Sequence, residues 1–598
     1  MRKKLAIDDG AAGVLHWRWL IVSGLVFFAA AGMGYLGFDQ HYRACGRPIP
    51  WWDLVYLSLQ LFVLQSGLVD GPTPWMLVVA RMLAALFTAS AAILALGSIC
   101  RSEIRAFRLG RSKRHAVVCG VGDKATALIR DLRNQNVRVV AIDLNADKRL
   151  MRNCEGAEVF AMDDDATRLS CLAKARVQDA RQVFITTGND STNVEIASQV
   201  INLLRSRGRA QKEGRLACHV HLVDRQTNEL FRQNHVFQEA VPLVDVRVFN
   251  VYDNAARLLW RRQLMARGPV APTDRRRMHV VIGGLGQMGE AVLLRVVKSG
   301  HFANGRKSVI TIVDRQPELV RGRVRHRYPA LETICELEFV EGDINLPDTA
   351  RTIGACLARP DEIGTVVLCA DHNHENFAAA LQMASSVARS DIPIFVRLGL
   401  AAGLAELLKS ERSESALARQ LEAFGLVADC CAAEAVLEDD LFRFAGSFHQ
   451  AYVRSRLRAG VAPTDASLKD WNDLDEQFRE SSCEQAEHME LKLRTFGFAV
   501  DSGMGAHAPV FTDEQVQVLA RMEHARWCAE RWLAGWTYAP PPKNAVRRTS
   551  PHLVPWEQLE ESIRQVDYDT VRSIPAIVSE FPSPTEAGTL PKISLCQF

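Results

Sequence analysis

The chain has 598 residues, of which 48% are hydrophobic, with a mean hydropathy of −0.04 and a net charge of +3. This length is too great for one hydrophobic core, so we expect three or four units. The near balance of charge argues against nucleic acid as a partner, and the fourteen cysteines include no CxxC pair, which argues against a disulfide frame and a zinc site.

Two apolar stretches near the amino terminus are long enough to span a bilayer. Residues 19–38 contain no charged side chain, and residues 75–99 form a second hydrophobic segment. The first follows MRKK and also fits a signal peptide, but a second span follows it, so we interpret both as membrane helices. Lysine and arginine precede the first span and follow the second, which predicts that both termini are cytoplasmic. We therefore expect a cytoplasmic segment at 1–16 and a two-span domain at 17–100.

The segment between the spans contains an apolar run, residues 53–65, that is too short to cross a bilayer. We interpret it as a re-entrant helix, which is tolerated only where protein or water satisfies its backbone. The order of span, short helix, glycine loop and span resembles the two-helix pore of the potassium-channel superfamily, whose filter sequence is TVGYG.

Some members of this family have an arginine in the inner helix, and Arg81 resembles it. Counting back from Arg81 places the filter slot of this chain on five consecutive residues: Gly67, Leu68, Val69, Asp70 and Gly71. Only the last glycine matches the family, so the carbonyl ladder lacks its central glycine. A fourfold ring of Asp70 would still attract cations. The alternative is a plain two-helix anchor with a surface loop.

An internal repeat follows the second span. Each copy alternates continuous apolar strands with amphipathic helices, which predicts an α/β fold with a parallel sheet covered by helices on both faces. The paired segments are 115–125 with 279–289, 137–145 with 308–316, and 182–197 with 365–380.

Each copy carries a glycine turn between strand and helix, followed by an acid at the end of the next strand. This order suits a phosphate at the helix amino terminus and a ribose hydroxyl at the acid. The candidate binding residues are Gly120, Gly122, Asp143, Asp163 and Thr186 in the first copy, and Gly284, Gly286, Gly289 and Asp314 in the second.

These motifs resemble the RCK domain family, also called TrkA-N, over roughly residues 112–440. The resemblance places one such domain at 101–244, a crossover helix and linker at 245–275, and a second domain at 276–440. It implies a tetrameric gating ring that binds NAD(H), an adenine nucleotide or a divalent ion as a signal. No segment with a paired acid and base follows either copy, so we do not expect an enzyme.

Each of two polar clusters could be either a metal site or a solvated polar loop. Asp163, Asp164 and Asp165 close the third strand of the first copy, where clustered carboxylates suit a hard cation. A solvated strand-end loop is the other reading. His372 and His374 lack a third ligand nearby, so we interpret them as a polar loop and expect no metal.

The carboxy-terminal region begins with charged, helical sequence at 441–511, which we assign to a linker or helical cap. A plausible helix cap, Thr512 with Glu514 close by, then opens a new helix. His524, Trp527 and Arg531 fall on one face of this helix. Trp536 and Tyr538 follow a glycine, and Trp556 comes after HLVP.

Residues 512–582 resemble the ryanodine-receptor repeat domain in the order of these motifs, except that Asp569 stands where the family often has asparagine. The resemblance implies a sensor for a small molecule, and a second nucleotide messenger is the ligand that it suggests. Tryptophans and arginines suit such a ligand because indoles stack a base and guanidinium groups bind a phosphate. The alternative is that the tryptophans form a small core. The relevant residues are Trp527, Trp532, Trp536 and Trp556 with Arg531, Arg547, Arg548 and Arg572.

These features predict a homotetrameric, ligand-gated cation channel of a bacterial-type inner or plasma membrane, in contact with lipid and ending in a loose tail at 583–598. Two alternatives remain: a membrane-anchored nucleotide sensor without a pore, and a redox enzyme on a membrane anchor.

Overall fold

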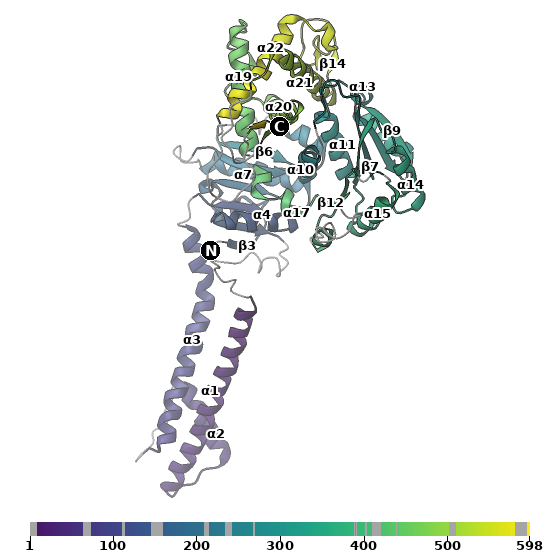
Figure 1. Cartoon of the computed structure of the whole chain (residues 1–598). Coiled ribbons are helices and arrows are strands. Elements are labelled where there is room, and N and C mark those ends of the chain that lie inside the picture. Colours follow the sequence, from purple (N-terminus) through teal and green to yellow (C-terminus); the bar gives the residue numbers. More distant parts are fainter. Residues whose placement is uncertain are drawn as a thin grey trace. The chain divides into compact units, whose positions relative to one another are not determined.

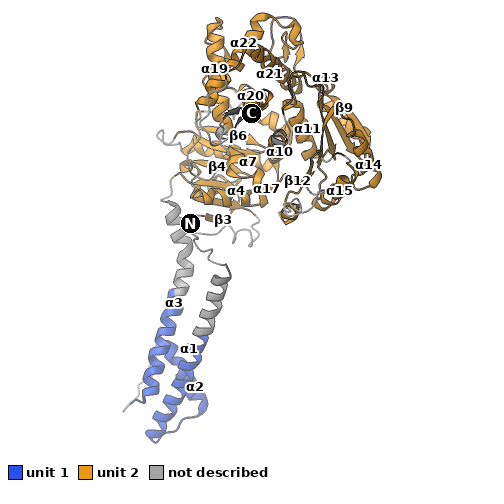
Figure 2. Ribbon diagram, in the orientation of Figure 1, with its two compact units in different colours: residues 1–112 blue, residues 113–598 orange. Residues whose placement is uncertain are grey.

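The computed structural model describes residues 9–63, 73–110, 114–144, 159–207, 214–233, 242–266, 269–387, 389, 391–400, 403–408, 420–437, 439–500, 510–580 and 595–597. The chain divides into two units, residues 1–112 and 113–598 (Figure 2). Each unit has hydrophobic core of its own.

The first unit is a helical hairpin with a short helix in its connection (Figure 1). Its elements are α1 Asp9–Ala44, α2 Trp51–Gln60, the 3-10 turn η1 Leu61–Val63, and α3 Trp75–Gly110. The two long helices pack against each other, and α2 packs on α1. The short helix predicted at 53–65 is present as α2 and η1. The predicted filter slot, residues 67–71, lies outside the described residues.

Small residues and one hydroxyl hold this hairpin together. A Cβ at Gly37 would lie 2.9 Å from the Cβ of Leu77, so glycine lets α1 approach α3 closely. The hydroxyl of Thr88 on α3 donates to the carbonyl of Phe62 at 2.8 Å. The short segment is therefore fastened to the second long helix as well as to the first.

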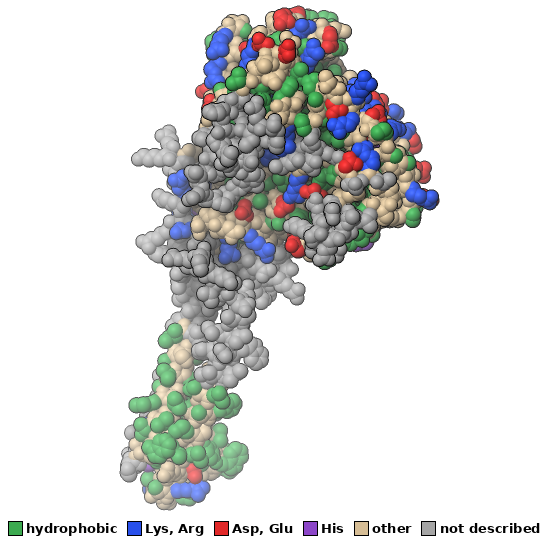
Figure 3. Space-filling model, viewed as in Figure 1, with side chains coloured by type: hydrophobic (Ala, Val, Ile, Leu, Met, Phe, Trp, Pro, Cys, Tyr) green, Lys and Arg blue, Asp and Glu red, His purple; other side chains and the backbone are tan. Residues whose placement is uncertain are grey.

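One stretch among the described helices, Trp75–Ile93, is long and apolar enough to cross a bilayer. Only 17% of its most apolar window is buried, so most of its hydrophobic side chains face outward. Figure 3 shows hydrophobic side chains over much of this unit, with few charges among them. The predicted first span, residues 19–38, lies within α1, and the side chains of residues 19–22 are outside the described part of the chain.

The second unit contains two sheets, the first including β3 and β6 and the second β7, β9 and β12 (Figure 1). Both sheets are parallel and have six strands in the same order. The orders are β3-β2-β1-β4-β5-β6 and β12-β11-β10-β7-β8-β9. Counted within each copy, both read 3-2-1-4-5-6, the doubly wound order. The predicted repeat and the predicted parallel α/β class are confirmed.

The first copy is built as the repeat predicts, with buried apolar strands. Its strands are β1 Ala116–Cys119, β2 Val139–Asp143, β3 Val159–Asp163, β4 Gln182–Ile185, β5 Leu216–His221 and β6 Val244–Phe249. Its helices are α4 Asp123–Asn134, α6 Leu169–Lys174, η2 Val177–Asp179, α7 Asp190–Arg207 and α8 Arg225–Gln233.

The second copy repeats this arrangement. Its strands are β7 Arg277–Gly283, β8 Val309–Asp314, β9 Glu336–Glu341, β10 Glu362–Leu368, β11 Ile394–Arg397 and β12 Leu421–Phe424. Its helices are α11 Gln287–Ser299, α12 Pro317–Arg327, α13 Leu331–Ile334, α14 Pro347–Cys356 and α15 Asn373–Ser386.

The two copies exchange their last helices. After β6, helix α10 Val251–Ala266 packs on α11 of the second copy, where the amide of Gln263 donates to the hydroxyl of Thr365 at 2.5 Å. After β12, α17 Val427–Cys430 and α18 Ala433–Leu437 pack on α4 of the first copy. The crossover helix predicted from 245 thus begins at 251, because the preceding residues form edge strand β6.

Four helices form the carboxy-terminal layer: α19 Asp439–Arg458, α20 Glu476–Thr495, α21 Asp513–Leu533 and α22 Glu561–Ser579. They pack on one another, so the region predicted as a linker or cap is a cap. Its core is continuous with that of the second copy through residues of α11, α20 and α21. Buried Arg295 of α11 donates to Glu484 of α20 at 3.0 Å and fastens the layer to that copy.

Shorter elements complete this layer. They are η5 Ala466–Leu468, β13 Phe498–Val500, β14 Thr537–Tyr538, β15 Thr549–Ser550, η6 Trp556–Gln558 and β16 Leu595–Gln597. The last of these pairs antiparallel with β13, so part of the tail that we expected to be loose is a strand. The helix cap at Thr512 is present, but its reciprocal partner is Gln515 rather than Glu514.

Candidate functional site

The glycine turn of the first copy lies between β1 and α4, at the carboxyl edge of the sheet. Gly120 has φ +89, and a Cβ there would lie 2.8 Å from the backbone of Thr187, so this position requires glycine. Gly122 precedes α4 with no side-chain cap, and a Cβ there would meet nothing within 4 Å. The first N–H groups of a helix lack intrahelical partners and attract anions. The turn therefore leaves open space at a helix terminus suited to phosphate.

Two carboxylates close the neighbouring strands at the same edge. Asp143, at the end of β2, accepts from the N–H of Val121 at 2.6 Å, which holds the carboxylate beside the turn. Asp163 ends β3 directly opposite Asp143 in the strand register. An acid at the end of the second strand is the usual partner of a ribose hydroxyl. The pairing of Asp143 with the turn is in keeping with that role, which remains a prediction.

The fourth strand ends at the other side of the turn. Thr186 is buried, and its hydroxyl donates to the carbonyl of Gly120 at 3.1 Å, so it ties β4 to the turn. Asn193, fully buried on α7, donates to the carbonyl of His221 at 2.7 Å and accepts from the N–H of Thr187 at 3.0 Å. These bonds fix the loop between β4 and α7. Gly188 lies in this loop, and a Cβ there would meet nothing within 4 Å.

Lys124 is a residue of this site that the sequence analysis missed. It is the second residue of α4, and its Nζ lies 3.5 Å from Nε2 of His221 at the end of β5. Burial lowers the pKa of Lys124. Burial, helped by Lys124, lowers the pKa of His221 to about 3, so the ring is neutral. A partly buried ammonium group thus lies at the start of the helix that follows the glycine turn.

The second copy repeats the turn with tighter packing. Gly284 has φ +88, and a Cβ at Gly289 would lie 2.2 Å from the carbonyl oxygen of Gly284, so a side chain would push α11 from the turn. Gly286 precedes α11 as Gly122 precedes α4. Asp314 ends β8, and its carboxylate accepts from the N–H of Leu285 at 3.3 Å and of Gln316 at 3.0 Å.

The loop after the fourth strand differs between the copies. Asp371 occupies the position of Gly188, and its Oδ1 lies 3.7 Å from where a Cβ of Gly286 would be. The guanidinium of Arg397, at the position of His221, lies 3.3 Å from the same carboxylate oxygen and helps hold it there. A carboxylate beside the turn disfavours phosphate. The second turn therefore has an ion pair of Asp371 with Arg397 near Gly286, where the first turn has open space.

In the carboxy-terminal layer, the predicted face of α21 carries an aromatic stack. The ring of His524 stacks on that of Trp527 at 6.1 Å and meets the edge of Trp556 at 5.8 Å. One ring nitrogen of His524 lies 2.8 Å from the carbonyl of Val554. Tyr568 of α22 extends the cluster, with its ring 5.7 Å from that of Trp556.

Arg531 lies between two indoles. Its guanidinium carbon is 5.4 Å from the ring of Trp536 and 5.9 Å from that of Trp527. Its Nε is buried with no hydrogen-bond partner among the described residues. Trp536 is only 5% exposed and packs on Cys528 and Leu553, so it belongs to a small core, as the alternative interpretation held. Tyr538 points outward and is 57% exposed.

The other predicted arginines do not surround the tryptophans. Arg548 donates to the carbonyl of Ala534 at 2.9 Å and to Glu229 of the first copy at 2.5 Å. Arg572 lies over the ring of Tyr568 and pairs with Asp513, and Arg547 is exposed. Two cations that the sequence did not single out take their place: Lys543 over Trp536 and Arg564 over Trp556.

The polar side chains of the two candidate metal clusters contact nearby parts of the chain, such as Lys174 of α6, which donates to Asp164 at 3.2 Å. Among the described residues, no group of three histidine, cysteine or acidic side chains is arranged to hold a metal ion. Asp165 accepts from the hydroxyl of Thr167 and from its backbone N–H, and these two hydrogen bonds lower the pKa of the Asp165 carboxyl. His372 and His374 stack on each other at 5.6 Å.

Residues 116–216 match the family model of the TrkA-N domain, and residues 509–579 match that of the RyR domain. An uncharacterized protein of Methanothermus fervidus is 26% identical over 96 residues, which are 16% of this chain and 15% of that protein. The chain thus spans a small part of that relative's length.

Solved structures with similarity to this chain include two of GsuK and one of a gating ring. GsuK bound to ADP is 17% identical, with 72% of this chain and all of that chain covered, at a TM-score of 0.36. The GsuK channel bound to NAD is 15% identical, with 72% and 85% covered, at a TM-score of 0.36. The human SLO3 gating ring is 10% identical, with 55% and 83% covered, at a TM-score of 0.37.

Proposed function

We propose that this protein is a ligand-gated cation channel whose opening is controlled by a nucleotide bound to the first doubly wound copy. One observation carries the proposal. A helix that contains a membrane-length apolar stretch ends at Gly110, and the strand that leads into an open glycine turn begins at Ala116. Only five residues of chain therefore separate the helix assigned to the pore from the sheet assigned to nucleotide binding.

The pore is assigned to four copies of the α1–α2–α3 hairpin in a homotetramer, in contact with membrane lipid. The short α2 and η1 between the long helices suit a pore helix, and their ties to α3 suit a rigid frame for the filter slot at 67–71. Both termini are assigned to the cytoplasm of a bacterial-type cell. Eight doubly wound copies would then form the gating ring.

The nucleotide is assigned to NAD(H) or another adenine nucleotide, held chiefly by the first copy. Gly122 leaves room for phosphate at α4, Lys124 adds a nearby cation, and Asp143 is placed for a ribose hydroxyl. The TrkA-N match covers this copy. The nucleotide acts as a signal and no hydride transfer is proposed. Binding changes the gate only if the nucleotide prefers one state of the ring.

A second regulatory ligand is assigned to the aromatic cluster of the carboxy-terminal layer, within the residues that match the RyR domain. Trp527 and Trp556 are half-buried and offer ring surface, and Arg531 has an unpartnered Nε between two indoles. Base stacking and phosphate pairing suit a second nucleotide messenger. Trp527→Leu would weaken such binding, whereas Arg547→Gln, a change at an exposed arginine outside the cluster, would not.

Matched variants of the two acids test the nucleotide assignment. Titration calorimetry on the full chain in detergent should show that Asp143→Asn weakens NAD or ADP binding by at least about tenfold, equivalent to about 1.4 kcal/mol. The equivalent Asp314→Asn in the second copy should change it by less than about twofold. Equal losses in both variants, or no binding by the wild type, would contradict the assignment.

A membrane-anchored sensor without a pore is the second candidate, and the sequence of the filter slot favours it. Gly67, Leu68, Val69, Asp70 and Gly71 lack the central glycine of the potassium-channel filter. Asp70→Asn separates the two functions. In liposomes, a pore should change its preference between cations and anions, whereas an anchor should show the same absence of flux before and after the substitution.

A further inference from the structure

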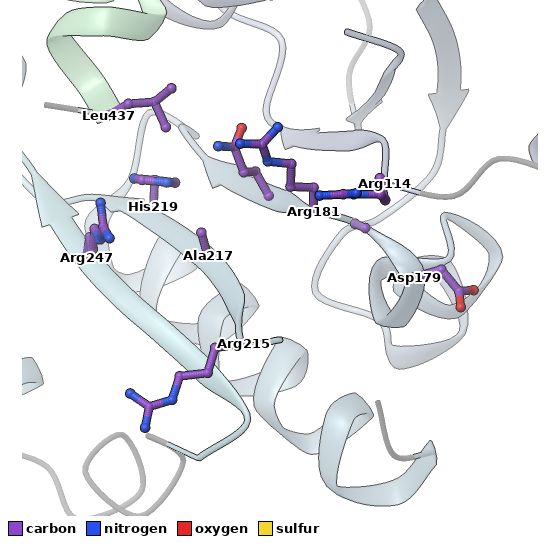
Figure 4. Close-up of a pocket in the computed structure, with 10 residues that line it drawn as sticks. Arg114, Asp179, Arg181, Arg215, Ala217, His219, Arg247 and Leu437 are labelled. Carbon is purple, nitrogen blue, oxygen red and sulfur yellow. The ribbon is translucent and has the colours of Figure 1, made fainter. Parts of the chain in front are cut away.

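A basic cavity of about 250 Å³ opens at the amino-terminal edge of the first sheet (Figure 4). Arg114, Arg181 and Arg215 line it from just before β1, β4 and β5, and Arg247 lines it from β6. The strands are parallel, so this edge is opposite the carboxyl edge that carries the glycine turn. The cavity is therefore separate from the nucleotide site.

Two of the four guanidinium groups lack a carboxylate partner. Arg215 donates to Asp473 at 2.7 Å, and Arg247 donates to Asp245 at 2.8 Å. Neither Arg114 nor Arg181 has such a partner in the part of the chain that the structure describes. The remaining acid of the lining, Asp179, pairs with Arg176 at 2.8 Å, and in Figure 4 its carboxylate points away from Arg181. The cavity keeps a net positive charge.

A buried histidine, His219, lines the cavity. His219 is 1% exposed, and both of its ring nitrogens lack a partner among the described residues. Its ring stacks on Phe184 at 4.9 Å, which holds it in place. Burial, with help from Arg247, lowers its pKa to about 3, so the ring is neutral and offers one donor and one acceptor. Buried polar groups are rarely left unpaired, so this ring indicates a missing partner.

We propose that this cavity binds a small phosphate-bearing anion between Arg114, Arg181, Arg247 and His219. Guanidinium groups pair with phosphate through forked hydrogen bonds, and the neutral ring adds a donor or an acceptor. The volume is below that of pockets for drug-sized ligands, which excludes a dinucleotide. A free phosphate ester and a lipid head group share this chemistry.

The position of Arg114 gives the site a regulatory meaning. Arg114 is the first described residue after α3, and its backbone N–H donates to the carbonyl of Asp179 at 3.0 Å. An anion held by Arg114 and Arg181 would fasten the start of β1 to the start of β4. It would therefore stiffen the point at which the chain from α3 joins the first sheet.

Binding to the full chain in detergent tests the proposal, with inorganic phosphate and glycerol 3-phosphate as soluble probes and short-chain phosphatidic acid as the lipid probe. Arg181→Gln should weaken binding at least tenfold, because it removes a guanidinium group that has no carboxylate partner among the described residues. Arg181 is exposed, so we expect the variant to fold. His219→Phe keeps the stack on Phe184 and should also weaken binding. Arg138→Gln is the matched control, because Arg138 is exposed just before β2 at the same edge but does not line the cavity.

Each outcome decides the matter. Soluble probes that bind wild type and Arg138→Gln but not Arg181→Gln support a free phosphate ester, and the same pattern with phosphatidic acid alone supports a head group. Equal binding by all variants, no binding of any probe, or an effect of Arg181→Gln on oligomer mass without phosphate binding would overturn the proposal. NAD binding should be unchanged in Arg181→Gln, so this result is distinguishable from failure of the nucleotide assignment.

Discussion

The two doubly wound copies share strand order, glycine turn and strand-end acid, yet they differ where a phosphate would approach. In the first copy Gly188 leaves the mouth of the turn open. In the second, Asp371 brings a carboxylate near Gly286, with Arg397 pairing to it. The comparison teaches that the fold supplies the frame, whereas one loop residue decides whether a carboxylate lies near the helix terminus.

Substitutions at Gly289 of the second copy and at the equivalent Ala125 of the first copy should differ most in their effect on stability. Gly289→Ala would place a Cβ 2.2 Å from the carbonyl oxygen of Gly284, so α11 must move. We expect a loss of about 3 kcal/mol in the free energy of unfolding. The reverse change at the equivalent position, Ala125→Gly, should cost about 1 kcal/mol through helix propensity. Thermal unfolding in detergent measures both, and equal losses would contradict the tighter packing of the second copy.

Acid should loosen the first sheet before the second. Burial lowers the pKa of both His219 and His221 to about 3, and the second copy has Phe395 and Arg397 at these positions. The second copy has a partly buried histidine of its own, His301, but burial lowers its pKa only to about 4, so it contributes less acid sensitivity than the two rings of the first copy. The unfolded chain protonates its histidines near pH 6.5. The stability that depends on these neutral rings is therefore complete above about pH 6.5 and is lost as the pH falls toward 3. At pH 5 each ring should already have cost the folded state about 2 kcal/mol of its free energy of unfolding.

Hydrogen exchange at pH 7 and pH 5 checks this expectation. Peptides that cover β1 and β4 should lose protection at pH 5, and those that cover β7 and β10 should lose less. His219→Phe should reduce the difference, because it removes one of the two titrating rings. Equal loss of protection in both sheets would contradict the explanation.

Exchanging the loop residue should exchange the behaviour of the copies. Gly188→Asp brings a carboxylate to the mouth of the first site, and open space there lets the fold tolerate it. We expect nucleotide affinity to fall by about tenfold, or about 1.4 kcal/mol. Gly188→Asn is the matched neutral control and should cost less than half of that free energy. Calorimetry decides, and an identical effect of both variants would assign the loss to shape rather than charge.

The smallest expected effect is a gain in the second copy. Asp371→Asn removes the carboxylate near Gly286 while it keeps the size of the side chain. We expect a few-fold increase in affinity for ADP at a second, weaker site, seen as a rise in stoichiometry from about one to about two per chain. An unchanged stoichiometry would mean that Asp371 does not keep the second turn empty.

Much of the fold could be predicted from the sequence, because buried parallel strands are continuous apolar runs and the motifs occur twice. Edge strand β6 could not, because Asp245 and Arg247 interrupt its apolar residues and pair with each other. The site was predicted only as far as its local motifs. The approach of Asp371 to Gly286, the docking of Arg548 on Glu229 and the burial of Trp536 depend on distances between remote segments, which no local pattern contains.

The central claim is that nucleotide binding in the first copy moves an ion gate. Conductance across a planar bilayer that contains the purified full chain, with NAD, NADH or ADP added to the side that bears the termini, tests it most directly. The account predicts a cation current that changes with nucleotide, keeps its response in Asp314→Asn, and needs at least tenfold more nucleotide in Asp143→Asn. A bilayer that stays silent with every nucleotide, or a current that none of them changes, would contradict it.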